Sequence, residues 1–302
     1  MTWRAKFFLG VPLGLLFIGL ILALDGWLLT RLINQGIRDQ QINTLVFLMG
    51  LLVLLSIPLL FVLAYQTLSC LTLTYHVDRN GVVVRWAGTE QIIPIRDIQQ
   101  IVPGVQLGKQ IVRRRGLRWP GHERGVGQVP GIGRTRFLAT RPLDDQLLLV
   151  TPGLAVGISP QDPGAFLHAF EARRELGPNR LLEREIHPAL WSTWRIWTDQ
   201  TAWALLGAAV AINLALFGYL ATRFPNLDAQ LPLHFTSMGQ ADRIGTKLEL
   251  FGLPIIGLII LGTNLIVGLV LYKRERAGSY LLWGSAAAAQ ALFWLATFSI
   301  LP

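Results

Sequence analysis

Five long apolar runs divide the sequence, and charged residues are nearly absent from them. The runs cover residues 7–29, 45–64, 201–221, 250–272 and 279–301. Each is about as long as the roughly 20 mostly apolar residues that a helix needs to cross a bilayer. The pattern predicts a multi-pass α-helical membrane protein with about five transmembrane helices.

The segment between the second and third runs, 70–179, has the pattern of β-strands. Apolar and polar residues alternate over 70–77, which is the period of a half-buried strand. Asn80-Gly81 then supplies a hairpin turn, because both central residues of that turn need positive φ, and 82–86 returns as the partner strand. Further strands are predicted at 89–95, 146–152 and 154–160.

A helix is predicted to close this segment. Asp162 is a good N-cap, and Pro163 suits the first helical position because the N–H that it lacks would have no partner inside the helix. Phe166 and Phe170 lie on one apolar face, and Gly177-Pro178 ends the run.

Consecutive hairpins sealed by one C-terminal helix resemble a bacterial pleckstrin-homology (PH)-like domain over about 70–176. The most specific part is FLATRPLDDQLLLVTPGLAVGISPQDPGAFLHAF, 137–170. The resemblance implies a β-barrel with a C-terminal helix, and it implies binding of peptides, proteins or lipid headgroups. It argues against an enzyme.

Three tryptophans precede the third apolar run. Trp191, Trp194 and Trp197 are spaced three residues apart within 180–198, and tryptophan concentrates at the headgroup level of a bilayer. We expect this segment to be an amphipathic helix that anchors on the membrane surface. An aromatic ligand site is the less favoured alternative.

A polar loop, 223–249, separates the third and fourth runs. Its order and spacing resemble the bacterial membrane domain of unknown function 1648, which also occurs in Sdp-type immunity and signal-transduction proteins. The residues that carry the resemblance are Leu231-Pro232, His234-Phe235, Gly239, Asp242-Arg243, Gly245 and Lys247.

Two physical interpretations of this loop stay open. In the favoured one, Asp242 pairs with Arg243 or Lys247, His234 packs on Phe235, and Gly239 turns the chain, which makes a structural cap. In the other, His234 and Asp242 converge on a ligand, a metal or an extracytoplasmic peptide. One histidine and one carboxylate are too few for a zinc site, which takes three or four protein ligands.

Composition agrees with a membrane protein, because 52% of the 302 residues are hydrophobic, the mean hydropathy is +0.46, and only 15% are charged. Asp25 is the one charged residue inside the five runs. Lysine and arginine residues near the ends of the runs favour a cytoplasmic N-terminus, because that orientation places ten of them on the cytoplasmic side of the membrane and five on the outer side. The inner set is Arg4, Lys6, Arg79, Arg85, Arg180, Arg184, Arg195, Lys273, Arg274 and Arg276, and the outer set is Arg31, Arg38, Arg223, Arg243 and Lys247.

This orientation places 74–197 in the cytoplasm of a bacterium, below its plasma membrane. The net charge of +9 matches the anionic inner leaflet, and no nucleic-acid motif is present. A basic loop, with Arg113, Arg114, Arg115 and Arg118, either grips lipid headgroups or is simply a solvated loop near the membrane.

Other signals of chemistry are weak. The glycines of 125–133 have the wrong spacing for a dinucleotide site, and no nucleophile, metal-ligand or cofactor motif is found. Inside the apolar runs, Asn213, Asn264 and Gln290 are expected to hold helices together by hydrogen bonds, and Gly284 with Ala288 to allow close helix approach.

The sequence therefore favours a non-catalytic, cofactor-free membrane protein that binds or regulates. Its outer loop would sense or shield, and its cytoplasmic domain would dock a protein or a lipid. A transporter or an immunity protein against a secreted toxin is the alternative function, although the apolar runs carry no charged residues at mid-membrane.

Overall fold

A computed structural model describes residues 1–6, 9–108, 114–115, 119–235 and 241–301. It contains two compact units, which we describe one at a time. The first comprises Met1–Leu24 and Ser56–Thr193, and the second comprises Asp25–Leu55 and Trp194–Pro302.

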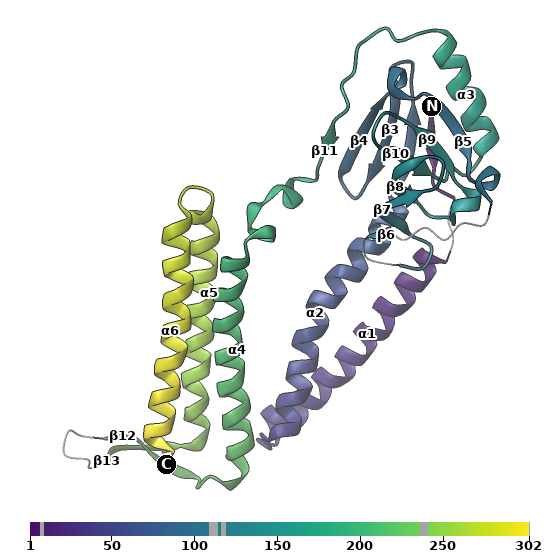
Figure 1. The fold of residues 1–302 in the computed structure, drawn as a ribbon. Coiled ribbons are helices and arrows are strands. Elements are labelled where there is room, and N and C mark those ends of the chain that lie inside the picture. Colours follow the sequence, from purple (N-terminus) through teal and green to yellow (C-terminus); the bar gives the residue numbers. More distant parts are fainter. Residues whose placement is uncertain (7–8, 109–113, 116–118, 236–240, 302) are drawn as a thin grey trace. The chain divides into compact units, whose positions relative to one another are not determined.

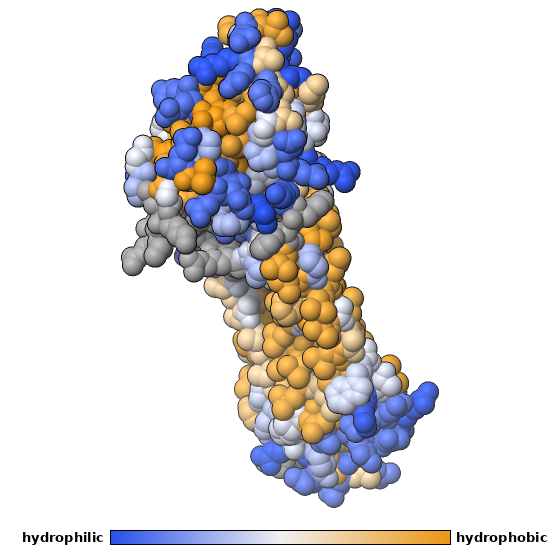
Figure 2. Space-filling view, turned by 90° about the vertical axis from the view of Figure 1, so that its right-hand side faces the viewer, coloured by the Kyte–Doolittle hydropathy of each residue, from blue (hydrophilic) through white to orange (hydrophobic). Residues whose placement is uncertain are grey.

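Five helices of the described chain are long and apolar enough to cross a membrane, as the sequence predicts. They expose many large apolar side chains, because side chains that face lipid need no cover from the protein. Phe61, for example, is 73% exposed. Figure 2 shows an apolar band over the helical part of the face in view. The helices are α1 (Gly10–Leu32), α2 (Thr44–Leu71), α4 (Gln200–Arg223), α5 (Gly252–Tyr272) and α6 (Arg276–Ile300).

The first unit contains an antiparallel sheet in the order β1-β2-β3-β4-β11. A turn joins β2 to β3 at the expected place, but it is not the predicted Asn-Gly turn, because neither Asn80 nor Gly81 has positive φ and Gly81 already belongs to β3. Asp78 Oδ1 fixes the turn by accepting hydrogen bonds from the N–H groups of Asn80 and Gly81 at 2.8 Å. The strands are β1 (Thr2–Arg4), β2 (Thr74–Val77), β3 (Gly81–Trp86), β4 (Thr89–Pro94) and β11 (Ile186–His187).

A second sheet packs against the first, in the order β5-β9-β10-β8-β7-β6. Pro94 and a 3-10 turn at Ile95–Asp97 redirect the chain after β4, so that the next strand pairs in the other sheet. The prediction of a barrel is therefore wrong in one respect, because the two sheets do not join into a closed barrel. The strands are β5 (Gln100–Pro103), β6 (Arg114–Arg115), β7 (Glu123–Val129), β8 (Gly133–Ala139), β9 (Leu147–Val150) and β10 (Ala155–Ile158).

The core lies between the sheets and under one helix. The predicted helix is α3 (Pro163–Glu175), and Asp162 Oδ1 accepts from Ala165 N at 2.9 Å, which confirms the N-cap. Phe166 and Phe170 on its inner face are buried. Tyr75 joins the two sheets, since its hydroxyl donates to Leu138 O at 2.8 Å and accepts from Ser159 N at 3.1 Å.

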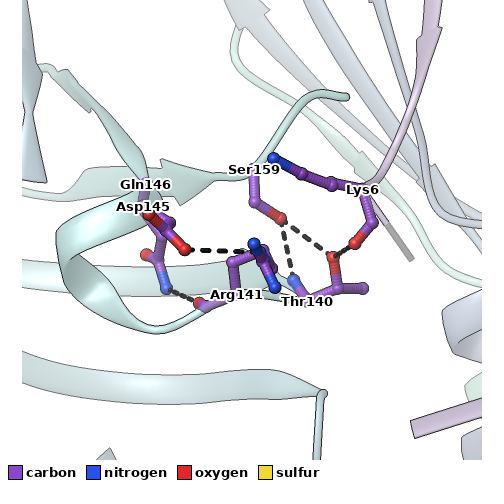
Figure 3. Close-up of polar contacts among 6 residues, drawn as sticks. All are labelled: Lys6, Thr140, Arg141, Asp145, Gln146 and Ser159. Atoms are coloured by element: carbon purple, nitrogen blue, oxygen red, sulfur yellow. Dashed lines mark hydrogen bonds and ion pairs between the residues drawn. The ribbon is translucent and has the colours of Figure 1, made fainter. Parts of the chain in front are cut away.

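The N-terminal segment completes the first sheet, which the sequence did not predict. β1 pairs antiparallel with β2, and Ala5 forms a bridge with Pro160. Figure 3 shows how the segment is fastened: Thr140 Oγ1 donates to Lys6 O at 2.6 Å, and Ser159 Oγ accepts from Thr140 N at 2.8 Å. Residues before the first transmembrane helix thus belong to the same folded unit as those after the second.

In the second unit, α4, α5 and α6 pack side by side (Figure 1). As expected, Asn213 and Gln290 join the helices: Asn213 Nδ2 donates to Gln290 Oε1 at 2.8 Å and to Pro254 O at 3.0 Å, and Gln290 Nε2 donates to Gly257 O at 2.9 Å. Glycines of α5 make the closest approaches, however: an added Cβ would lie 2.3 Å from Gln290 Oε1 at Gly257 and 2.2 Å from Trp283 Nε1 at Gly268. At Gly284, the predicted contact position, an added Cβ would meet nothing within 4 Å.

The segment 180–198 is not the continuous amphipathic helix that we expected. It forms β11 and two 3-10 helices, Leu190–Thr193 and Arg195–Thr198. Pro188 explains the break, because proline disfavours helical geometry in the residue before it and lacks a backbone N–H. β11 instead adds to the edge of β4.

The loop between α4 and α5 is a β-hairpin of β12 (Gln230–Phe235) and β13 (Ala241–Thr246). Buried Leu231 fastens it to the bundle through a cluster that includes Leu216, Leu220 and Leu250. Thr246 and Glu249 form a capping box at the 3-10 turn that leads into α5.

Candidate functional site: a cationic cleft

A cleft of about 360 Å³ opens in the first unit where the last turns of α2 meet both sheets. Its lining combines cationic and aromatic side chains with apolar ones, and it includes no carboxylate among the described residues. The principal side chains are Tyr65 of α2, Trp86 of β3, Arg124 of β7, Arg136 and Phe137 of β8, and Ile186 and Pro188 beyond α3.

Arg124 lies between two aromatic rings. Its guanidinium carbon is 5.6 Å from the centroid of Tyr65 and 5.4 Å from that of Trp86. Arg124 Nη1 also donates to the Tyr65 hydroxyl at 2.9 Å. These contacts hold a planar cation in a defined orientation, which lowers the entropy cost of binding an anion to it.

Arg136 is half-buried, and its one polar side-chain partner in the described chain is neutral. Arg136 Nη1 donates to Gln91 Oε1 at 3.2 Å. Burial lowers the pKa of Arg136, and the positive charges of Arg184, Arg134 and Arg124 lower it further. An arginine stays charged in proteins, so this cation is desolvated without an anion beside it.

The segment that follows α3 forms one wall of the cleft. β11 pairs with β4 through Ile186↔Gln91 and His187↔Glu90. This pairing places Ile186, Pro188 and Ser192 on the cleft. Arg184, just before β11, donates to Leu154 O at 2.8 Å, which fixes the approach of the segment.

The arrangement suits a ligand with an anionic group and an apolar part. A guanidinium offers paired N–H donors to a carboxylate or phosphate, and hydrogen bonds to charged groups are shorter and about twice as strong as neutral ones. Two such groups, desolvated and unpaired with any described carboxylate, make anion binding favourable here. The cleft holds no described cysteine, serine-histidine pair or carboxylate that would serve as a nucleophile or base.

The residues that the sequence singled out are not in this cleft. Of the basic loop, Arg113 and Arg118 lie outside the described residues, and Arg114 and Arg115 form the edge strand β6 opposite Gly127 and Val126. The headgroup role of this loop stays a prediction.

The three predicted anchor tryptophans lie in the short 3-10 helices or beside them. Trp194 is 43% exposed and Trp197 is 52% exposed. Only the backbone of Trp191 is described. The ring centroid of Trp197 lies 6.0 Å from that of Trp203, near the start of α4, with the two rings tilted by 32°.

In the outer hairpin, the described motif residues make structural contacts. Arg243 pairs with Glu249 at 3.0 Å, a partner that the sequence did not suggest. Lys247 Nζ donates to Phe224 O and Leu227 O and lies 4.5 Å from the Phe224 ring. At Gly245 an added Cβ would lie 2.3 Å from Leu233 Cδ1, so a larger residue there would require the Leu233 side chain to move.

The other residues of the predicted hairpin motif lie at the edge of the described residues or outside them. Gly239 lies outside the described residues, and His234 and Phe235 are described as backbone of β12 only. Asp242 begins the described side chains of β13 and is exposed. Convergence of His234 and Asp242 on a ligand stays a prediction.

Sequence reasoning missed the cleft because its arginines lie in a stretch rich in glycine. The residues 123–139 form a hairpin in which Arg136 pairs with Val126, and Arg124 with Leu138. This register brings the two arginines to one site. The available signal was the alternation in RTRFL, 134–138, which is typical of a strand with a cationic face.

Comparison with family models gives two matches on separate parts of the chain. Residues 73–174 match a bacterial PH domain, and residues 211–258 match the domain of unknown function DUF1648. Both resemblances expected from the sequence are confirmed. No curated protein and no solved structure matches the chain. The protein is thus a membrane protein that combines a PH-like domain with DUF1648.

Proposed function

We propose that this protein is a non-catalytic membrane receptor or regulator whose PH-like domain docks an anionic group in the cationic cleft. The observation that carries this proposal is Arg136, a half-buried cation surrounded by further arginines and paired with no described carboxylate. The free energy lost on desolvating this arginine is recovered when an anion binds.

The proposed orientation is with the N-terminus and the PH-like domain in the cytoplasm of a bacterium, supported by the ten-to-five distribution of lysine and arginine. The partner is a cytoplasmic protein with an acidic segment or an anionic lipid. The hairpin of β12 and β13 then lies on the outer face, where it senses or shields.

Purification of the full chain in a mild detergent tests this function. The double variant Arg124→Gln/Arg136→Gln removes both cleft charges, and Arg174→Gln is the matched control, because Arg174 lies exposed on α3 and does not line the cleft. Proteins and lipids that co-purify with each form are quantified by mass spectrometry.

We expect one protein or anionic lipid to co-purify stoichiometrically with the wild type and with Arg174→Gln. Each charge-assisted hydrogen bond contributes about 1.5–3 kcal/mol, so the double variant should retain the partner at least about tenfold less. An identical set of partners at equal amounts in all three forms refutes the proposal.

A further inference from the structure

An apolar groove runs along the surface of the helical bundle between α4 and α5. It has a volume of about 450 Å³. On one side it is lined by Trp203, Gly207 and Val210 of α4, and on the other by Leu261, Leu265 and Leu269 of α5. These positions recur every three or four residues, so the groove follows the helix axes.

The groove extends over about two thirds of one leaflet of a bilayer. Trp203 and Val210 are seven residues apart, which is about 10 Å along a helix at 1.5 Å per residue. Half of a hydrocarbon core of about 30 Å is about 15 Å. Both walls belong to helices long and apolar enough to span a membrane, so the medium around the groove is lipid hydrocarbon.

Amphipathic side chains mark one end of the groove. Trp194 and Trp197 line it just before α4 begins. Lys273, one residue beyond the end of α5, places its Nζ 4.8 Å from the centroid of the Trp194 ring. Tryptophan and lysine together are typical of the headgroup level, so this end is the mouth and the groove descends from it.

The charge at the mouth is predominantly positive. No carboxylate pairs with Lys273 within the part of the chain that the structure describes. One nearby acid, Asp199, already accepts hydrogen bonds from Ala202 N and from the hydroxyls of Tyr272 and Tyr280, and the other is Glu275. The cations close to the mouth in sequence are Arg195, Lys273, Arg274 and Arg276.

We propose that this groove is a binding site for one anionic phospholipid, with an acyl chain between α4 and α5 and the headgroup phosphate beside Lys273. The apolar groove extends over most of a leaflet, so it can accommodate a lipid acyl chain. The cations at its mouth suit a phosphate group. This inference concerns the helical bundle and does not depend on the cationic cleft.

The test uses the full chain, purified in detergent, and native mass spectrometry with added phosphatidylglycerol or phosphatidylcholine. Gly207→Leu fills the groove from α4, where an added Cβ meets nothing within 4 Å, and Leu265→Trp fills it from α5. Gly284→Leu is the matched control, because it adds the same side chain on α6 in open space outside the groove. Lys273→Gln tests the headgroup contact.

We expect the wild type and Gly284→Leu to retain one phosphatidylglycerol, and both groove-filling variants to bind it at least about tenfold more weakly. Lys273→Gln should lose the preference for phosphatidylglycerol over phosphatidylcholine. Equal retention by the wild type, Gly207→Leu and Leu265→Trp would overturn the proposal. A wild-type dimer that both filling variants dissociate would overturn it too, because a second copy of the chain would then occupy the groove.

Discussion

Replacing Gly257 by alanine should destabilise the helical bundle through one polar network. The added Cβ would lie 2.3 Å from Gln290 Oε1 and 2.7 Å from Asn213 Nδ2, well inside van der Waals contact. The two amides must move, which breaks the bond between them and the bond from Gln290 to Gly257 O. Interhelical hydrogen bonds in membrane proteins contribute about 0.6 kcal/mol on average and about 1.7 at most, so the loss should be about 1–3 kcal/mol.

Reversible unfolding in mixed micelles of increasing denaturing-detergent content measures this loss. Gly262→Ala is the control on the same helix, because an added Cβ there meets nothing within 4 Å. It should leave stability unchanged or raise it, since alanine favours helices over glycine. In a Gln290→Ala background, Gly257→Ala should lower stability by less than it does in the wild type, because the atom nearest to the added Cβ is absent. Equal stability of Gly257→Ala and Gly262→Ala would refute the network as the reason for this glycine.

Three further predictions concern single polar contacts. Hydrogen bonds from Tyr272 and other donors lower the pKa of Asp199 to about 2 from an ordinary 3.8, so its stabilisation is complete above about pH 4 and is lost as pH falls toward 2. Asp199→Asn should therefore lower the unfolding midpoint at pH 7 and flatten its dependence on pH in that window. Burial lowers the pKa of His122 to about 4 from 6.5, so the unfolded chain takes up a proton at higher pH than the folded chain does. The free energy of unfolding should therefore decrease by up to about 3 kcal/mol as pH falls from 6.5 to 4. His122→Gln should remove this loss in unfolding curves recorded across the same range. Thr140→Val deletes the hydrogen-bond donor to Lys6 O and should cost about 1 kcal/mol of local stability. Backbone amides of the N-terminal strand should then exchange hydrogen about fivefold faster, as measured by mass spectrometry. Unchanged exchange rates would contradict the contact in Figure 3.

Long-period patterns and a local capping signal predicted much of this fold from the sequence. The five apolar runs became five helices whose ends are shifted by at most three residues, except that α2 continues to Leu71, seven residues beyond its predicted end. The hairpin of β2 and β3 and the Asp162 cap formed as expected, because each depends on a few neighbouring residues. The turn itself differs, since Asn80 and Gly81 lack the positive φ that the predicted turn type needs. The bonds between Asn213 and Gln290 were also expected, since an amide in a membrane helix needs a partner.

Features that depend on distant pairing were not predicted. β7 and β8 lie in a stretch whose glycines weaken any strand signal, and Gly131 has φ +77° because it turns the hairpin between them. The cationic cleft exists only through the register of that hairpin and the addition of β11 to β4. Likewise, the contact glycine of the bundle was assigned to α6 from an alanine-rich pattern, whereas the interhelical amides select Gly257 of α5.

The pairing of β1 with β2 has a consequence for how the chain crosses the membrane. Residues 2–4 precede α1 and residues 74–76 follow α2, and yet they hydrogen-bond in one sheet. A sheet cannot form across a bilayer, because open strand edges are not tolerated in hydrocarbon. Both segments therefore lie on the same side, and α1 and α2 cross as a pair between them. The bacterial PH match begins at residue 73, so the strand that completes this sheet comes from outside the matched region. The domain is thus joined to α1 through β1 and to α2 through β2, in the same sheet that carries Trp86 of the cleft.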